Sequence, residues 1–490
     1  MSVNTVSHSP LSPPRTVPSQ TPVAHMASAR DLQVTDRIAR IPDMLRMRLV
    51  LILVLTVATT LCGLMAYRAY EGVVRTIGLD TVPSIVAAEK IRSTLAAAHT
   101  QAVNVFLATR AADRTQAAAD FRKSTGQANQ SLVDASQNIT YGDEERQPIL
   151  KAMNGLADYL QTLGAAFALA PAQPGGALPE AAGTALAHAD ELMRDTILPA
   201  TRALDDANFT HMDAAFHGGR QHATLWLCGL IAMTVALGVA LLHTQVLMTT
   251  VFRRRINIPM ATGTGVLIVC TLLFAGKALN TAADIRTAKL DAFDSVHALT
   301  QAQAVAYIAN AAESVYLIDQ GRTEAQAGQT AIFRQATDQL LDPSLLGTDM
   351  DRLVLDAGTT QGLKGKGLLA DELANITFPG EESAARATAA AWNAYVSIDA
   401  RIRALEGASR HADAVTLCNG TQPGQSDWAF EQFDRALERT LKINQDQFDA
   451  AISRGLAHAA WLWILLIPLF LGPALGAVVG IRQRLAEFGD

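Results

Sequence analysis

The stretch ATLWLCGLIAMTVALGVALLHTQVLMTTVFRRRINIPMATGTGVLIVCTLLFAGK, residues 223–277, decides the fold. It holds two apolar runs, 223–252 and 258–277, and three arginines between them are its only charged residues before Lys277. Each run is long enough to cross a hydrocarbon core of about 30 Å as a helix. The stretch therefore predicts two membrane spans, joined at 253–257 by a basic turn that is too short to hold a domain.

Two further apolar runs, 49–67 and 455–481, bring the expected number of spans to four. Basic residues flank them on one side: Arg46 and Arg48 precede the first run, and Arg482 and Arg484 follow the last. Because basic residues beside short loops favour the cytoplasm, we expect both termini inside and the two large segments, 68–222 and 278–454, outside. The chain is thus expected to be a multi-pass bacterial plasma-membrane protein in contact with the lipid bilayer. The first span lies too deep in the chain for a cleaved signal peptide.

The composition excludes several function classes. Of the 490 residues, 49% are hydrophobic and the net charge is −6, which argues against nucleic acid as a partner. Cys418 is the only cysteine in the two large segments, so neither can form an internal disulfide. The sequence has no His-Glu-x-x-His, paired-cysteine or Gly-x-Ser-x-Gly motif. We therefore expect no catalytic residues, no bound metal and no cofactor.

The two large segments share one helical plan. In each, small and apolar residues recur at alternating steps of three and four, which is typical of one buried helix face. The first segment is expected to continue with helices at about 113–137, 143–168 and 178–220, the last with a kink at Pro199. The seam residues are Ala88, Ile91, Leu95, Ala98, Ala102 and Val105 in the first segment, and Ala298, Ala302, Val305, Ala309, Ala312 and Tyr316 in the second.

Short sequence matches between the two large segments, which occur in the same order in both, indicate a duplication. Leu79-Asp80 with Ser84 recurs as Leu290-Asp291 with Ser295, Phe121-Arg122 as Phe333-Arg334, and Met212-Asp213-Ala214-Ala215 as Phe448-Asp449-Ala450-Ala451. The second copy carries extra residues, expected to be loop, at 342–380 and 408–425. Residues 1–36 read as a disordered Ser- and Pro-rich cytoplasmic tail, and 482–490 as a short cytoplasmic tail. The predicted fold is all-α: four transmembrane helices and two extracytoplasmic four-helix bundles in tandem, with long helices continuous with the spans.

Three sets of residues are candidates for function. Arg92, Arg122 and Arg334 could bind a carboxylate ligand through their fork geometry, although a solvated helix face is the plainer interpretation. Gly472, Gly476 and Gly480 form a stripe that lets a helix approach closely, within this chain or in a homo-oligomer. Arg253, Arg254 and Arg255 offer a surface to a cytoplasmic partner.

The segment VAAEKIRSTL at 86–95, followed by AVNVFL at 102–107, resembles the first helix of the four-helix-bundle sensor domains of bacterial chemoreceptors. The resemblance implies a similar fold and a site of sensing outside the membrane. The chain departs from chemoreceptors because neither the second nor the fourth span leads into a long signalling coiled coil.

The layout, with RRRIN at 253–257 and RQRLAEF at 482–488, also resembles actinobacterial membrane sensors that carry two external four-helix bundles in tandem. Those proteins are associated with an extracytoplasmic glutamine-type solute-binding protein and a cytoplasmic serine/threonine kinase of the protein kinase G type. The resemblance implies a sensor that relays an extracellular signal, such as amino-acid availability, to a separate cytoplasmic effector. The alternative is a membrane scaffold or assembly protein whose bundles dock an external partner without signalling.

Overall fold

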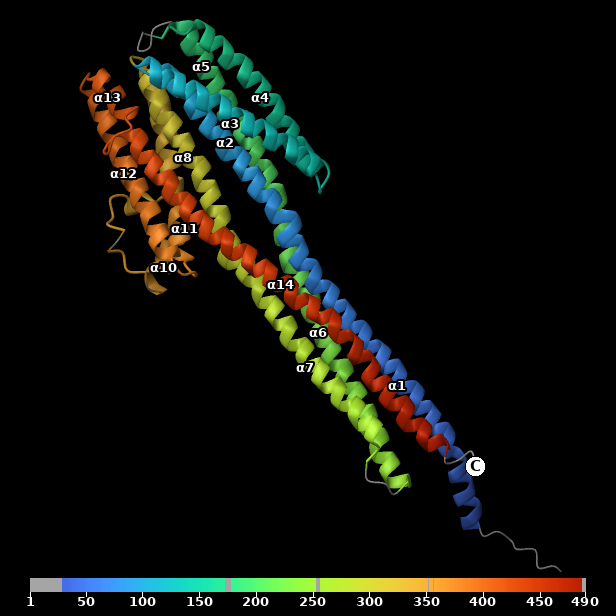
Figure 1. Ribbon diagram of the computed structural model, residues 1–490. Helices are drawn as coiled ribbons and strands as arrows, with labels where there is room; N and C mark the ends of the chain where they lie inside the picture. The colour runs from blue at the N-terminus through green and yellow to red at the C-terminus, as the bar shows by residue number, and fades with distance from the viewer. Residues whose placement is uncertain (1–28, 172–177, 253–255, 351, 356, 487–490) are drawn as a thin grey trace, which may run out of the picture.

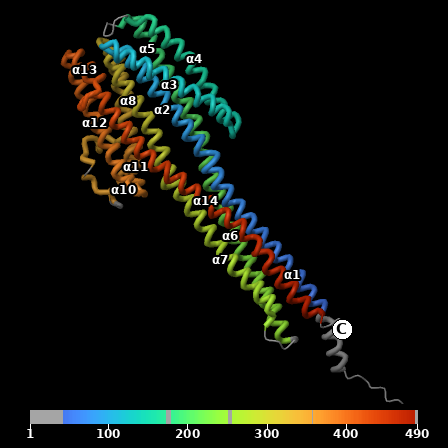
Figure 2. Tube along the Cα trace, viewed as in Figure 1, coloured from blue at the N-terminus to red at the C-terminus, as the bar shows by residue number. Residues whose placement is uncertain are grey.

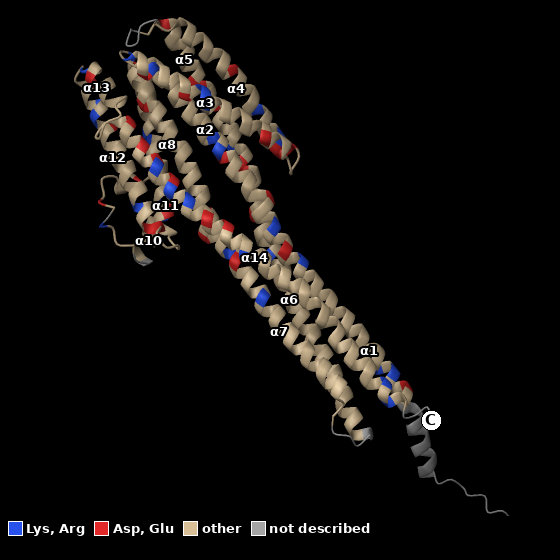
Figure 3. Cartoon of the chain, viewed as in Figure 1, with Lys and Arg blue, Asp and Glu red and all other residues tan. Residues whose placement is uncertain are grey.

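The computed structural model describes residues 29–171, 178–252, 256–350, 352–355 and 357–486, and it confirms the all-α class for them. Four helices contain an apolar stretch long enough to cross a membrane, as predicted. They are α1 (Ala29–Arg75), α6 (Leu198–Phe252), α7 (Ile258–Arg286) and α14 (Ser426–Leu485), which run side by side in one long stalk (Figure 1). Charged residues are sparse along this stalk and frequent beyond it (Figure 3).

The beginning of α1 differs from the prediction for the N-terminal tail. The helix starts at Ala29, so the last part of the segment predicted as disordered, residues 29–36, is helical. This part, ARDLQVTD, lacks proline and contains good helix formers, unlike the Pro-rich residues before it. Residues 1–28 lie outside the described part of the chain.

Three of the four long helices adjoin a π-helical turn. Such turns are rare and often occur at functional sites. Pro199, where a kink was predicted, comes directly after one of them. The turns are η1 (Thr76–Thr81), which joins α1 to α2 (Val82–Leu107); η2 (Met193–Ile197), which joins α5 (Glu180–Leu192) to α6; and η3 (Thr287–Phe293), which joins α7 to α8 (Asp294–Ile318).

The first unit comprises α2, α3 (Ala111–Gln137), α4 (Asp143–Leu169) and the helix that runs from α5 into α6. Its core contains the buried side chains of Leu95, Tyr159 and Leu186. The second unit comprises α8, α9 (Thr323–Leu340), α12 (Glu381–Gly407) and the first half of α14, around Trp392 and Phe433.

The two extra segments of the second unit are not simply loops. They contain η4 (Pro343–Leu345), α10 (Ala357–Leu363), α11 (Leu368–Ala374) and α13 (His411–Cys418). The prediction of loop was therefore wrong for these residues. Leu369, Leu373 and Val415 are buried in the core of the second unit, and their apolar contacts stabilise helices too short to form alone.

The two units are joined along α2 and α8, which lie side by side in Figures 1 and 2. Thr100 Oγ donates to the carbonyl of Tyr307 at 3.1 Å, and Ser314 Oγ donates to Asn104 Oδ1 at 3.0 Å. The sequence predicted one buried face on each helix, but both helices are buried on two sides. Alanines such as Ala96 and Ala311 on the second face let the helices approach each other closely.

Both units repeat one turn, which supports the duplication. The sequence Asn-Ile-Thr-aromatic occurs at 138–141, before α4, and at 375–378, before α12. Glu145 accepts the backbone N–H groups of residues 140 and 141, at 2.6 and 2.7 Å. Glu381 accepts those of residues 377 and 378, at 2.6 and 2.8 Å. This repeat is difficult to recognise from the sequence, because the residues that follow position 141 in the first turn differ from those that follow position 378 in the second.

The predicted glycine stripe of α14 packs against α7 within the same chain. A Cβ added at Gly472 would lie 2.5 Å from Val266, and one at Gly476 would lie 2.6 Å from the carbonyl of Pro259. At Gly480 the neighbour is Asn257, whose Nδ2 donates to the Gly480 carbonyl at 2.9 Å. Of the two alternatives for the stripe, the structure thus shows intrachain packing. The basic turn residues Arg253, Arg254 and Arg255 lie outside the described residues.

Candidate functional site

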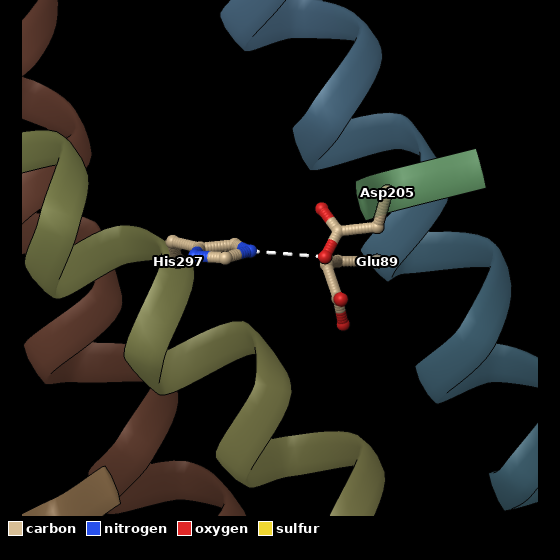
Figure 4. A group of neighbouring side chains, drawn as sticks. All are labelled: Glu89, Asp205 and His297. Atoms are coloured by element: carbon tan, nitrogen blue, oxygen red, sulfur yellow. Dashed lines mark hydrogen bonds and ion pairs between the residues drawn. The ribbon is translucent and has the colours of Figure 1, made fainter. Parts of the chain in front are cut away.

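Three ionisable side chains meet where the two units join the stalk. Glu89 comes from α2, Asp205 from α6 and His297 from α8 (Figure 4). His297 Nε2 lies 2.9 Å from Asp205 Oδ2, and one polar atom of each residue lies within 4.8 Å of the others. Glu89 and Asp205 are fully buried. We call Glu89, Asp205 and His297 the junction triad.

Further polar and aromatic groups hold the triad in place. Arg92 lies one turn after Glu89 on α2, and its guanidinium is 3.4 Å from Glu89 Oε1. Phe209 stacks on the His297 ring with centroids 4.8 Å apart. Two carboxylate oxygens, Glu89 Oε2 and Asp205 Oδ1, are buried without a hydrogen-bond partner. Such groups are costly unless something compensates them.

Burial determines the protonation of Glu89. Desolvation raises the pKa of Glu89 to about 8, and the charge of Asp205 and a hydrogen bond with it add to this, whereas the charge of Arg92 opposes it. Glu89 therefore holds a proton at neutral pH. One imidazole and two carboxyl groups are also ligands that a divalent transition-metal cation accepts. The triad can thus respond to a proton or a cation.

A second polar contact joins the units farther from the stalk. His99 on α2 lies 3.0 Å from Asp190 Oδ1, and Gln329 on α9 donates to Asp190 Oδ2 at 3.2 Å. Arg194, on the π-helical turn η2, donates to the same carboxylate at 3.1 Å. These groups line a cavity of about 20 Å³, which is room for a single water molecule. It is too small for an organic ligand.

The structure does not bring the three predicted arginines together. Arg92 is buried and its guanidinium lies 3.4 Å from Glu89 Oε1, so it is not open to a ligand. Arg122 on α3 and Arg334 on α9 are exposed. Their equivalent places in the two units fit the duplication, and their contact with a ligand stays a prediction.

The sequence reasoning missed all three residues of the triad. Glu89 directly follows the seam residue Ala88. Asp205 and His297 lie on helices of different units, and their burial depends on how the two units pack together. One signal was present: Glu89 and Arg92 interrupt a long run of small and apolar residues on the predicted seam helix. Ionisable side chains on a helix that is buried all round need partners from elsewhere.

Glu89→Gln is expected to stabilise the protein at pH 8 and to change little at pH 5. The folded-state pKa of Glu89, about 8, lies above the ordinary value of 4.5. Between these two pKa values the folded chain therefore holds a proton that the unfolded chain has lost. The contribution of the Glu89 carboxyl group to the free energy of unfolding is therefore fully present below pH 4.5 and is lost as the pH rises toward 8. We expect a gain of roughly 4 kcal/mol at pH 8.

The measurement is urea unfolding of the full chain in detergent at the two pH values. Glu324→Gln, on the exposed face of α9, is the control and should not alter the pH dependence. If Glu89→Gln shifts stability equally at both pH values, the buried carboxyl does not hold the proton.

One part of the chain is similar to a known protein family. Residues 73–217 match the family model of the actinobacterial sensor domain. The match begins near the end of α1 and covers α2 to the first part of α6, so it contains Glu89, Asp205 and the whole first unit. No curated protein and no solved structure matches the chain. A sensor domain together with four apolar helices fits a membrane sensor.

Proposed function

We propose that the chain relays a signal from its two units, placed outside the cytoplasm, to a separate effector inside. The match to the actinobacterial sensor domain supports the sensing part of the proposal. The basic residues at the ends of the spans support the orientation, with both termini in the cytoplasm. Any enzymatic step would be supplied by a partner.

The observation that carries the proposal is the position of the junction triad. Each of its three residues lies on a helix that continues into a different span: α2 into α1, α6 into its own apolar part, and α8 into α7. The π-helical turns η1 and η3 lie between the triad and two of these spans. A change at the triad therefore alters the relative placement of three membrane helices, through shifts of about 1–2 Å of the kind used in other switches.

The partners are part of the same proposal. An extracytoplasmic solute-binding protein would dock on the two units, and a cytoplasmic serine/threonine kinase would read the turn at 253–257 and the tail at 482–490. Crosslinking in the native membrane, followed by mass spectrometry, tests these partners directly. Recovery of both proteins would support the relay, and recovery of envelope assembly proteins alone would favour the scaffold.

The relay itself is tested by distances between the ends of the spans. Spin labels are placed at Met47 on α1 and Ile258 on α7, both exposed at the proposed cytoplasmic end. The four native cysteines, Cys62, Cys228, Cys270 and Cys418, are replaced, and the protein is studied in lipid nanodiscs. Asp205→Asn is expected to shift the mean label distance by about 2 Å, because it weakens the contact between α6 and α8.

Asp206→Asn is the matched control, since Asp206 is the exposed neighbour of Asp205 on the same helix. It should leave the distance unchanged. If Asp205→Asn lowers stability but leaves the label distance unchanged, the triad only holds the units together, and the relay through it is wrong.

A further inference from the structure

The two units differ at the hairpin tip that follows α3 in the first unit and α11 in the second. In the second unit the tip is closed against η3 and the start of α8. Asn375 Nδ2 donates to the carbonyls of Leu290 and Asp291, each at 3.2 Å, and lies 3.0 Å from Ser295 Oγ. Glu372 is buried behind it, and its Oε1 accepts a hydrogen bond from Asn444 Nδ2 at 3.2 Å.

The first unit has the same turn and equivalent neighbouring positions, but it lacks the carboxyl group of Glu372. The repeated Asn-Ile-Thr-aromatic sequence makes Asn138 equivalent to Asn375, and Ala135 therefore stands where the second unit has Glu372. Asn208 is equivalent to Asn444, since each lies five residues before the Asp of the repeated Asp-Ala-Ala segment. Asn138 is exposed instead of bonded to α2. A glutamate side chain is thus missing from the place that it fills in the second unit.

An open cleft of about 870 Å³ occupies this place in the first unit. Its walls come from the start of α2, the α3–α4 tip and α6, and the tip stands away from the stalk in Figure 1. Ala135 and Asn208 line it, and its charged lining residues are Asp80, Lys90, Asp134 and Glu145. The volume lies in the range of small-molecule sites, roughly 300–1,000 Å³.

Asn208 defines the chemistry of the cleft. It is 1% exposed, and its Nδ2 donates to the carbonyl of Leu204, just as Asn444 Nδ2 donates to Thr440. The second bond of Asn444, to Glu372, has no counterpart at Asn208 among the described residues. Asn208 Oδ1 is buried without a partner, as is Asn444 Oδ1 in the second unit. A buried amide with one free donor and one free acceptor matches a group that offers a carbonyl oxygen and an O–H or N–H beside it.

We propose that this cleft binds a small molecule that ends in a carboxylic acid group or the isosteric primary amide. Its carbonyl oxygen accepts from Asn208 Nδ2, as Glu372 Oε1 accepts from Asn444 Nδ2 in the second unit, and its O–H or N–H donates to Asn208 Oδ1. The site is separate from the junction triad and from the proposed relay. Its test therefore needs no cytoplasmic readout, and either proposal can fail without the other.

The probes are propionic acid and propionamide, because propionic acid has the structure of the glutamate side chain beyond Cα. Saturation-transfer NMR of the full chain in detergent is expected to show saturable millimolar binding of at least one of them. n-Propylamine, which has no carbonyl oxygen, should give no saturable signal. Ala135→Glu supplies the missing side chain in place of the ligand and is expected to weaken binding at least tenfold.

A second variant keeps the test valid if a buried glutamate prevents folding. Ala87 is exposed on the wall of the cleft, so Ala87→Trp should block it without changing the core. Ala119→Trp, on an exposed face of α3 away from the cleft, is the control and should bind like the wild type. The proposal is overturned if neither probe binds saturably, or if binding persists in both Ala135→Glu and Ala87→Trp.

Discussion

Asp205→Ala is expected to lower the free energy of unfolding by about 3 kcal/mol, the lower end of the range for breaking a buried ionic contact. Asp205 is fully buried, and its carboxylate is the partner of His297 on the opposite unit. Without it, the His297 ring loses its buried carboxylate partner. The loss should appear in urea unfolding monitored by tryptophan fluorescence.

Asp206→Ala removes an exposed carboxylate one residue away and should cost less than about 0.5 kcal/mol. A double-mutant cycle with His297→Ala separates the contact between the units from the general cost of truncation. A coupling energy near zero between the two positions would show that the His297–Asp205 contact does not hold the units together.

Gly263→Leu is expected to destabilise the packing of α7 on α14 by about 3 kcal/mol, the upper end of the range for overpacking. A Cβ at this position would lie 2.7 Å from the carbonyl oxygen of Gly472 and 3.3 Å from Cα of Gly476. These neighbours are backbone atoms, so no side chain can turn aside, and the two helices must move apart. Thermal unfolding in nanodiscs measures the effect.

Gly265→Leu is a closely matched control because the same substitution is made half a turn away on α7. Gly265 is exposed, and a Cβ there meets nothing within 4 Å. It should leave the unfolding temperature almost unchanged. Equal effects of the two substitutions would mean that the glycine contact between α7 and α14 does not limit stability.

The helices of the first unit were predictable because local signals mark them. The acidic run Asp143-Glu144-Glu145 begins α4, and the predicted helix at about 113–137 is observed as Ala111–Gln137. The short helices of the second unit were not predictable. α11 and α13 have seven and eight residues, and helices of this length are stable only through contacts that the sequence does not state.

The sequence by itself determined the four spans, the helical class and the glycine stripe on α14, because these follow from hydropathy and spacing along a single helix. Only the tertiary structure decided that α2 packs against α8, and with it that Glu89, Asp205 and His297 meet. It also decided that one unit is closed by Glu372 while the other leaves a cleft beside Asn208. These features join residues far apart in the chain, and such pairings depend on how whole helices pack rather than on any local pattern.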